Sequence, residues 1–111
     1  MDINCTSPEA ARHYLRDIEP KWRGFWFHMH LPAMSLREFV AGLDKIDDNV
    51  YIYHVKGHDN AMAAWMQEVV GDIVLAEALR SAPDRAAASA AANLRLREIE
   101  AVVRDSQPAG R

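Results

Sequence analysis

Hydrophobic residues return every three or four positions in the segment 36–46, which is the spacing of one face of an α-helix. These positions are Leu36, Phe39, Val40, Leu43 and Ile46. Ser35 precedes the run and Glu38 follows three residues later, in the S-x-x-E pattern of a helix N-terminal capping box. We therefore predict a helix over this segment that buries one complete apolar stripe.

A second set of helical spacings follows in the next part of the chain. The apolar stripe there consists of Met62, Trp65, Met66 and Val69. Asp59 or Asn60 is suited to cap its start, and Gly71 is suited to end it in a left-handed conformation. Asp72 then begins another short helix, which ends at about Arg80. The pattern predicts two short helices that meet at a bend.

The run Phe25–Leu31 has a period of two, which is typical of a β-strand, and Pro32 ends it. Its two alternating sets are Phe25, Phe27, Met29 and Leu31, and Trp26, His28 and His30. The candidate partner for a hairpin is Val50–Val55, a run that fits either a buried strand or a short helix. The acidic residues before that run, Asp47 and Asp48, favour a helix start.

A helix is expected near each end of the chain. Ser7, Pro8 and Glu9 supply a cap, a proline at the first helical position and an acid at the positive end of the helix dipole. We predict that this helix runs to about Ile18. The segment Asp84–Asp105 is rich in alanine and contains no glycine or proline, so it is predicted to be one long helix.

Two interpretations of the C-terminal helix are open. Hydrophobic residues at spacings of four, three and four form a short coiled-coil seam against which a second helix would pack. They are Ala92, Leu96, Ile99 and Val103. In that arrangement Arg95 and Glu100 would pair between helices. In the other interpretation the helix folds back on the core of its own chain.

Together these elements predict a mostly α, small single-domain helical fold with a C-terminal alanine-rich helix. A chain of 111 residues has room for one modest core. Residues 1–82 would form a compact helical domain, 83–105 the C-terminal helix and 106–111 a flexible tail. A short strand or hairpin, Phe25–Leu31 with Val50–Val55, is the β-structure that the pattern allows.

The segment Ser35–Leu79 also resembles a known family. Its sequence SLREFVAGLDKIDDNVYIYHV, followed by DNAMAAW and EVVGDIVLAEAL, is similar to the prokaryotic domain-of-unknown-function family 5752. The matching positions are Ser35, Leu36, Asp48, Tyr53, His54, Asn60, Trp65, Gly71 and Asp72. Ala61 departs from the pattern, because the family has an aspartate there. The resemblance implies a mostly helical small domain, with a helix at Val50–Val55, and it implies no particular activity.

Charge and cysteine content narrow the classes of function. The formal net charge of -3 disfavours a nucleic-acid partner held by phosphate neutralisation. No apolar run approaches the roughly 20 residues of a membrane-spanning helix, so no membrane partner is expected. Cys5 is the only cysteine, which leaves no internal disulfide or cysteine-based zinc site within one chain and favours a cytoplasmic location.

Histidines are the main candidates for chemistry. His28 and His30 would lie on one face of a strand, and His54 and His58 are spaced by one helical turn. If the two segments face each other, the four imidazoles would form a transition-metal site. Gly57 argues against this, since it would break a helix between His54 and His58. In the more ordinary interpretation His54 bonds to the backbone at the edge of the core, and His58 is solvated.

The remaining motifs favour interaction over catalysis. The chain has no hydrolase metal motif and no glycine-rich phosphate loop, so an enzyme is not the favoured class. Tryptophans are typical of protein interfaces, although in a small domain they more often fill the core. We expect a protein-interaction or self-association module that uses Trp26, Trp65, Leu96, Ile99 and Val103. The alternative is a metal- or small-ligand-binding protein that uses the four histidines.

Overall fold

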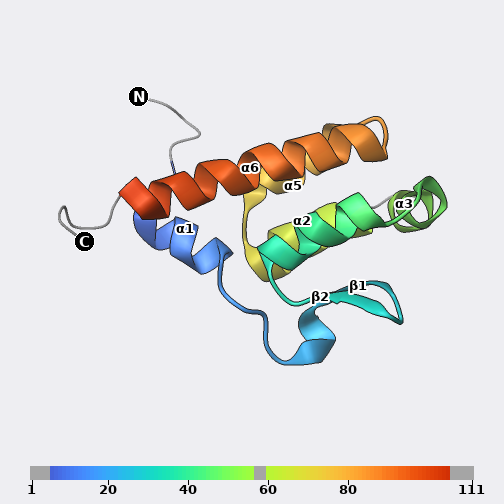
Figure 1. Cartoon of the computed structure of the whole chain (residues 1–111), viewed down its shortest axis with the longest axis horizontal. Coiled ribbons are helices and arrows are strands. Elements are labelled where there is room, and N and C mark those ends of the chain that lie inside the picture. Colours follow the sequence, from blue (N-terminus) through green and yellow to red (C-terminus); the bar gives the residue numbers. More distant parts are fainter. Residues whose placement is uncertain (1–5, 57–59, 106–111) are drawn as a thin grey trace.

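The computed structural model describes residues 6–56 and 60–105. Within these residues the chain forms six α-helices and a two-stranded antiparallel sheet (Figure 1). The elements are α1 (Pro8–Tyr14), η1 (Lys21–Arg23), β1 (Phe25–His28), β2 (Leu31–Ala33), α2 (Leu36–Lys45), α3 (Asp48–Val55), α4 (Ala61–Trp65), η2 (Met66–Val70), α5 (Ile73–Ser81) and α6 (Arg85–Asp105). The predicted mostly helical fold with a long C-terminal helix is confirmed.

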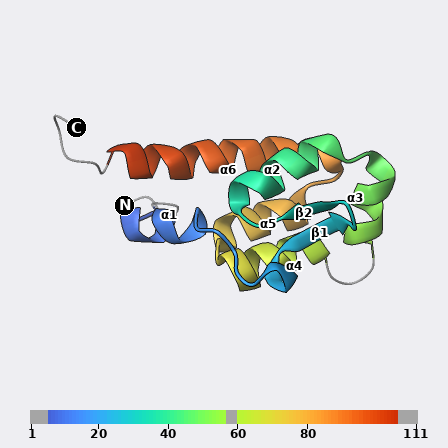
Figure 2. The same ribbon diagram turned by 60° about the horizontal axis from the view of Figure 1, so that its bottom comes forward.

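The long helix α6 is the element around which the others are arranged. It packs against α1, α2 and α5. In Figure 1, α1 lies below the C-terminal half of α6, while α2 and α5 lie beside its N-terminal half. Figure 2 shows the β1–β2 hairpin beside α3, at the end of the molecule away from α1. The C-terminal helix therefore folds back on its own core, as the second interpretation expected.

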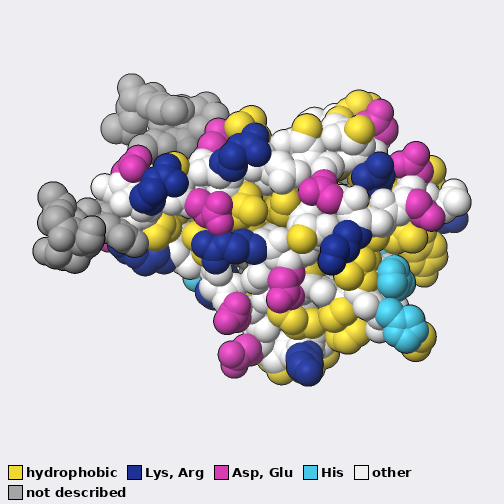
Figure 3. Space-filling model, in the orientation of Figure 1, with side chains coloured by type: hydrophobic (Ala, Val, Ile, Leu, Met, Phe, Trp, Pro, Cys, Tyr) yellow, Lys and Arg dark blue, Asp and Glu magenta, His cyan; other side chains and the backbone are white. Residues whose placement is uncertain are grey.

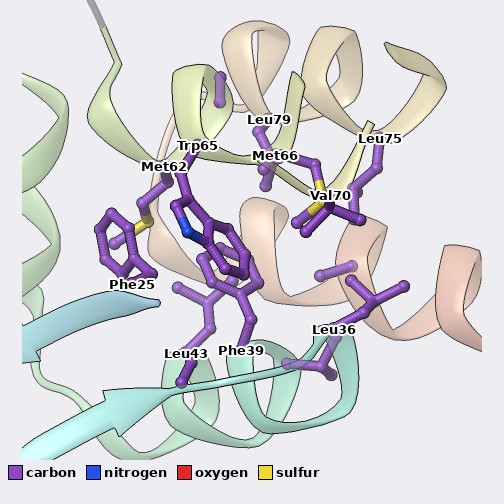
Figure 4. Close-up of a cluster of buried hydrophobic side chains, with 14 of the residues drawn as sticks. Phe25, Leu36, Phe39, Leu43, Met62, Trp65, Met66, Val70, Leu75 and Leu79 are labelled. Carbon is purple, nitrogen blue, oxygen red and sulfur yellow. The ribbon is translucent and has the colours of Figure 1, made fainter. Parts of the chain in front are cut away.

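Stacked aromatic rings form the centre of the core. The Phe39 ring of α2 stacks on Phe27 of β1 and on Trp65 of α4, with centroids 5.5 Å and 5.4 Å away. Phe25 meets the Phe39 ring edge-on at 5.7 Å. Figure 4 shows this cluster between α4 and α2. The predicted stripe of α2 is confirmed, and its buried members are Leu36, Phe39, Val40, Leu43 and Ile46.

The start of α2 is a variant of the predicted capping box. The Ser35 hydroxyl oxygen accepts the Glu38 N–H at 3.2 Å, as the pattern requires. The Glu38 carboxylate accepts the N–H of Met34 at 2.7 Å, one residue earlier than a standard box. The Ser35 and Glu38 side chains each accept one backbone N–H, so the start of α2 is fixed shortly after the end of β2.

Strand β1 pairs with β2, so the predicted pairing of Phe25–Leu31 with Val50–Val55 is wrong. In the observed register Trp26 lies opposite Pro32. Proline lacks an N–H, but each strand of a two-stranded sheet has a free edge, where proline is tolerated. The run Val50–Val55 instead belongs to α3, whose N-cap is Asp47. The helical interpretation of this run is therefore confirmed.

Two predicted boundaries move because of contacts from elsewhere in the chain. Helix α1 ends at Tyr14 rather than Ile18, since the Ile18 N–H donates to a carbonyl just after β2, at 2.6 Å. In η2 a π-helical turn brings Val70 into the core and leaves Val69 half-buried. Gly71 ends this turn with a φ of 95°, which is the left-handed cap that the sequence predicts.

The buried stripe of α6 contains a charged residue, Arg95, together with Ala88, Ala92 and Ile99. The Arg95 guanidinium donates two hydrogen bonds to the Asp72 carboxylate, at 2.8 Å and 3.1 Å. It donates another to the Thr6 hydroxyl at 2.9 Å. The predicted pairing of Arg95 with Glu100 is wrong, because Glu100 accepts from Arg37 of α2 at 2.7 Å.

The Arg95–Asp72 pair joins three helices. Asp72 also caps α5 by accepting the Leu75 N–H at 3.3 Å, and the Tyr14 ring of α1 lies 5.9 Å from the guanidinium. Burial by itself lowers the pKa of Arg95, but the hydrogen bonds and charge of Asp72, with a smaller contribution from Glu98, outweigh burial and raise it. The guanidinium is therefore charged in the folded chain.

Arg95→Met is expected to lower the free energy of unfolding by about 3–5 kcal/mol, because it leaves the Asp72 carboxylate buried without a cation. Arg97→Met, on the exposed side of the same helix, is the matched control and should change this energy by less than about 0.5 kcal/mol. Urea unfolding followed by circular dichroism measures both. A loss below about 1 kcal/mol for Arg95→Met would contradict the role given to the pair.

Candidate functional site

Strand β1 separates buried from exposed side chains by strict alternation. Phe25 and Phe27 point into the core, while Trp26 and His28 face solvent. Gly42 of α2 permits this close approach, because a Cβ atom there would overlap the Phe27 ring. The contact between Gly42 and Phe27 therefore fixes which side of the hairpin faces outward.

The exposed side chains that follow one another along η1, β1 and the turn form what we call the hairpin face. Its members are Trp22, Trp26, His28, Met29 and His30. Trp22 is 78% exposed, Met29 is 77% exposed and Trp26 is 41% exposed. The Trp26 indole N–H donates to the Lys21 carbonyl at 3.3 Å, which holds its ring beside η1. Two of the three tryptophans of the chain are thus presented to solvent.

Beyond η1, where Lys21 and Arg23 flank Trp22, the hairpin face carries no acidic or basic side chain other than histidine. The segment 24–36 contains no Asp, Glu, Lys or Arg. Figure 3 shows histidine side chains gathered beside hydrophobic ones at this end of the molecule. An apolar partner can therefore cover the segment without removing a carboxylate, ammonium or guanidinium group from water.

The structure brings together two of the histidines predicted to bind metal. The rings of His28 and His30 lie 6.4 Å apart, and the His30 N–H donates to Nδ1 of His28 at 3.3 Å. His58 lies outside the described residues. Across residues 6–56 and 60–105, no three side chains of His, Cys, Asp or Glu lie close enough to share a metal ion.

His54 has a different position, at the edge of the core between α3 and β1. Its Nε2 lies 2.8 Å from the carbonyl oxygen of Phe27, and since that oxygen can only accept, Nε2 carries the proton. The Phe25 ring meets the imidazole edge-on at 4.9 Å. The ordinary interpretation of His54, as a residue bonded to backbone, is confirmed. This bond connects the hairpin to α3.

Most of the residues predicted for interaction are buried or half-buried. Trp65 is 8% exposed and Ile99 fully buried, so both serve the core of the chain and offer no face to a partner. Leu96 and Val103 are half-buried against the same core. Trp26 is the member of the predicted set that is exposed. The expected coiled-coil seam is occupied by α1, α2 and α5.

The set predicted for interaction did not include Trp22 and Met29, the most exposed large side chains of the hairpin face, because tryptophan and methionine in a small domain more often fill the core. A signal for Trp22 was present, because it stands between Lys21 and Arg23, and a short segment with two charges is typical of the surface. Met29 belongs to the same alternating set as Phe25 and Phe27, which are buried. It is exposed because the strand ends at His28 and the chain turns there.

A second exposed apolar surface lies between α5 and α6. Ile73 is 58% exposed and Leu94 53% exposed, and Val74 and Leu94 border a groove of about 200 Å³. Arg95 and Glu98 also line this groove, and they pair with each other at 3.4 Å. Charged groups therefore interrupt this surface, unlike the hairpin face.

No family model, curated protein or solved structure matches the chain. The resemblance of Ser35–Leu79 to the domain-of-unknown-function family 5752 stays a prediction. Within the part of the chain that the structure describes, no helix combines the length and apolarity needed to cross a bilayer. The function of the site is therefore argued from its own geometry.

His54→Leu is expected to lower the free energy of unfolding by about 1–3 kcal/mol, because it removes the donor to the Phe27 carbonyl. Backbone amides of β1 should then exchange faster with solvent than those of α2. His54→Gln keeps a side-chain N–H donor and is the matched control, expected to retain most of the stability and protection. Equal losses in the two variants, measured by urea unfolding and hydrogen exchange, would show that the bond does not anchor the hairpin.

Proposed function

We propose that this chain is a protein-interaction module that associates with a second copy of itself through the hairpin face. The observation that carries the proposal is the exposure of Trp22 and Met29, at 78% and 77%. Covering a large apolar side chain contributes about 1.5–3 kcal/mol, and tryptophan and methionine are enriched at interfaces. Trp26 and the histidines beside them enlarge the same surface.

A second copy is the favoured partner because the face suits self-complementary contact. In a two-fold symmetric dimer the same patch meets itself, so a patch of one charge sign would face its like. The segment 24–36, which forms most of the hairpin face, has no carboxylate, ammonium or guanidinium group to create this repulsion, and the cations Lys21 and Arg23 lie at its edge beside Trp22. The groove between α5 and α6 is less suited, because Arg95 and Glu98 line it and would each need a partner in the complex.

The surface of α3 next to the hairpin extends the proposed contact. Tyr53 is 72% exposed, and its ring lies 5.2 Å from that of His54, which in turn bonds to β1. Even so, the combined surface is small, and small interfaces are typical of transient complexes. We therefore expect a reversible dimer with a dissociation constant on the order of micromolar.

Light scattering coupled to size exclusion is expected to report a dimer at high micromolar concentration. The double variant Trp22→Glu/Met29→Glu should shift the species to monomer, because two carboxylates on each copy would meet at the interface. Both residues are exposed, so the variant should keep the circular dichroism spectrum and the unfolding midpoint of the parent.

The matched control is Ile73→Glu/Leu94→Glu, which places the same charges on the other exposed apolar surface. This control should leave the dimer unchanged. A parent chain that is monomeric at high micromolar concentration would refute self-association. Loss of the dimer in the control alone would assign the interface to α5 and α6 instead.

Metal binding by the histidines is the second candidate function, and the adjacent rings of His28 and His30 favour it. Elemental analysis of protein purified without an affinity tag separates the two candidates. Stoichiometric zinc, copper or iron that is lost in His28→Gln/His30→Gln would establish the metal function.

A further inference from the structure

A pocket of about 230 Å³ lies between α3 and the corner that leads into α6, away from the residues of the hairpin face. Ile52, Val55 and Pro83 form its apolar wall. Pockets for drug-sized ligands usually exceed about 300 Å³, so this one suits a smaller molecule of several non-hydrogen atoms. Its wall would bury a short hydrocarbon chain.

Tyr51 contributes a phenol to the lining of this pocket. The residue is 5% exposed, and its hydroxyl has no hydrogen-bond partner among the described residues. No enclosed side-chain nitrogen or oxygen among the described residues is unsatisfied, and Tyr51 lines the pocket, so we assign its hydroxyl to this open space. Burial, and then the charge of Asp84, raises the pKa of Tyr51, which keeps the phenol neutral.

Among the charged groups around the pocket, one carboxylate oxygen has no hydrogen-bond partner in the described part of the chain. Asp48 and Arg85 pair with each other at 2.9 Å. Asp84 accepts the Ala87 N–H with Oδ1 at 2.8 Å and so caps α6, while its Oδ2 has no partner among the described residues. The Arg85 guanidinium is engaged by Asp48 and the Leu43 carbonyl, so a ligand that enters here meets a neutral hydroxyl and a carboxylate, both of which accept hydrogen bonds.

We propose that this pocket binds a small primary amine with an aliphatic chain. The ammonium group would donate hydrogen bonds to the Asp84 carboxylate and the Tyr51 hydroxyl, and the chain would lie on Ile52, Val55 and Pro83. An ammonium fits this set because it has three donors and a positive charge. A carboxylate ligand would instead face Asp84, and an uncharged alcohol would lose the attraction of the charge. This proposal does not rest on the proposed self-association.

Titration of the full-length chain with hexylamine, followed by amide chemical shifts in NMR, tests this assignment. We expect saturable binding with a dissociation constant on the order of 1 mM and shifts centred on α3 and the start of α6. Hexan-1-ol should bind at least about tenfold more weakly, because it lacks the charged hydrogen bond. Hexanoate should not bind.

Two variants test the polar contacts without disturbing the fold. Tyr51→Phe removes only the unpartnered hydroxyl, and Asp84→Asn removes the charge while asparagine still caps α6. Each should weaken hexylamine binding, Asp84→Asn by about tenfold. Glu68→Gln removes an exposed carboxylate from η2 and should leave the affinity unchanged. Equal affinity for hexan-1-ol, saturable binding of hexanoate, or unchanged affinity in both pocket variants would overturn the proposal.

Discussion

The buried ion pair of Arg95 and Asp72 constrains how the helices of this chain fit together. Removing two charges from water is costly, and the cost is offset only when both groups are fully hydrogen-bonded. That condition is met here by groups from α5 and its cap, from α6 and from the segment just before α1, since Asp72 accepts from Arg95 and Leu75, and Arg95 also donates to Thr6. Sliding α6 along α5 would break these bonds together, so the pair fixes one arrangement.

The parts of the fold that were predictable depend on residues a few positions apart. The caps by Ser35 and Asp72, the stripe of α2 and the left-handed Gly71 are all local patterns, and each is confirmed. The seam of α6 was predicted only in part: Ala92 and Ile99 are buried and Leu96 and Val103 partly buried, but Arg95 also takes a core position. Arginine at a helical position is normally solvated, and only the carboxylate presented by another helix makes Arg95 a core residue.

The candidate site was less predictable, because exposure is decided by distant parts of the chain. Trp26 and Trp65 are similar as residue types, yet Trp65 stacks on Phe39 of α2 and Trp26 rests beside η1. The hairpin itself depends on Gly42, which leaves room for the Phe27 ring. No local pattern in the sequence connects a glycine inside one helix with a strand that precedes it.

Helix α3 lies between the two proposed binding surfaces and belongs to both. His54 bonds to the hairpin, and Tyr51, three residues earlier, lines the pocket near α6. Residues three apart lie close to the same side of a helix, so Tyr51 and His54 share one side of α3. The side of α3 that supports the hairpin therefore also contributes Tyr51 to the pocket wall. Helix α3 thus connects the hairpin face physically with the pocket near α6.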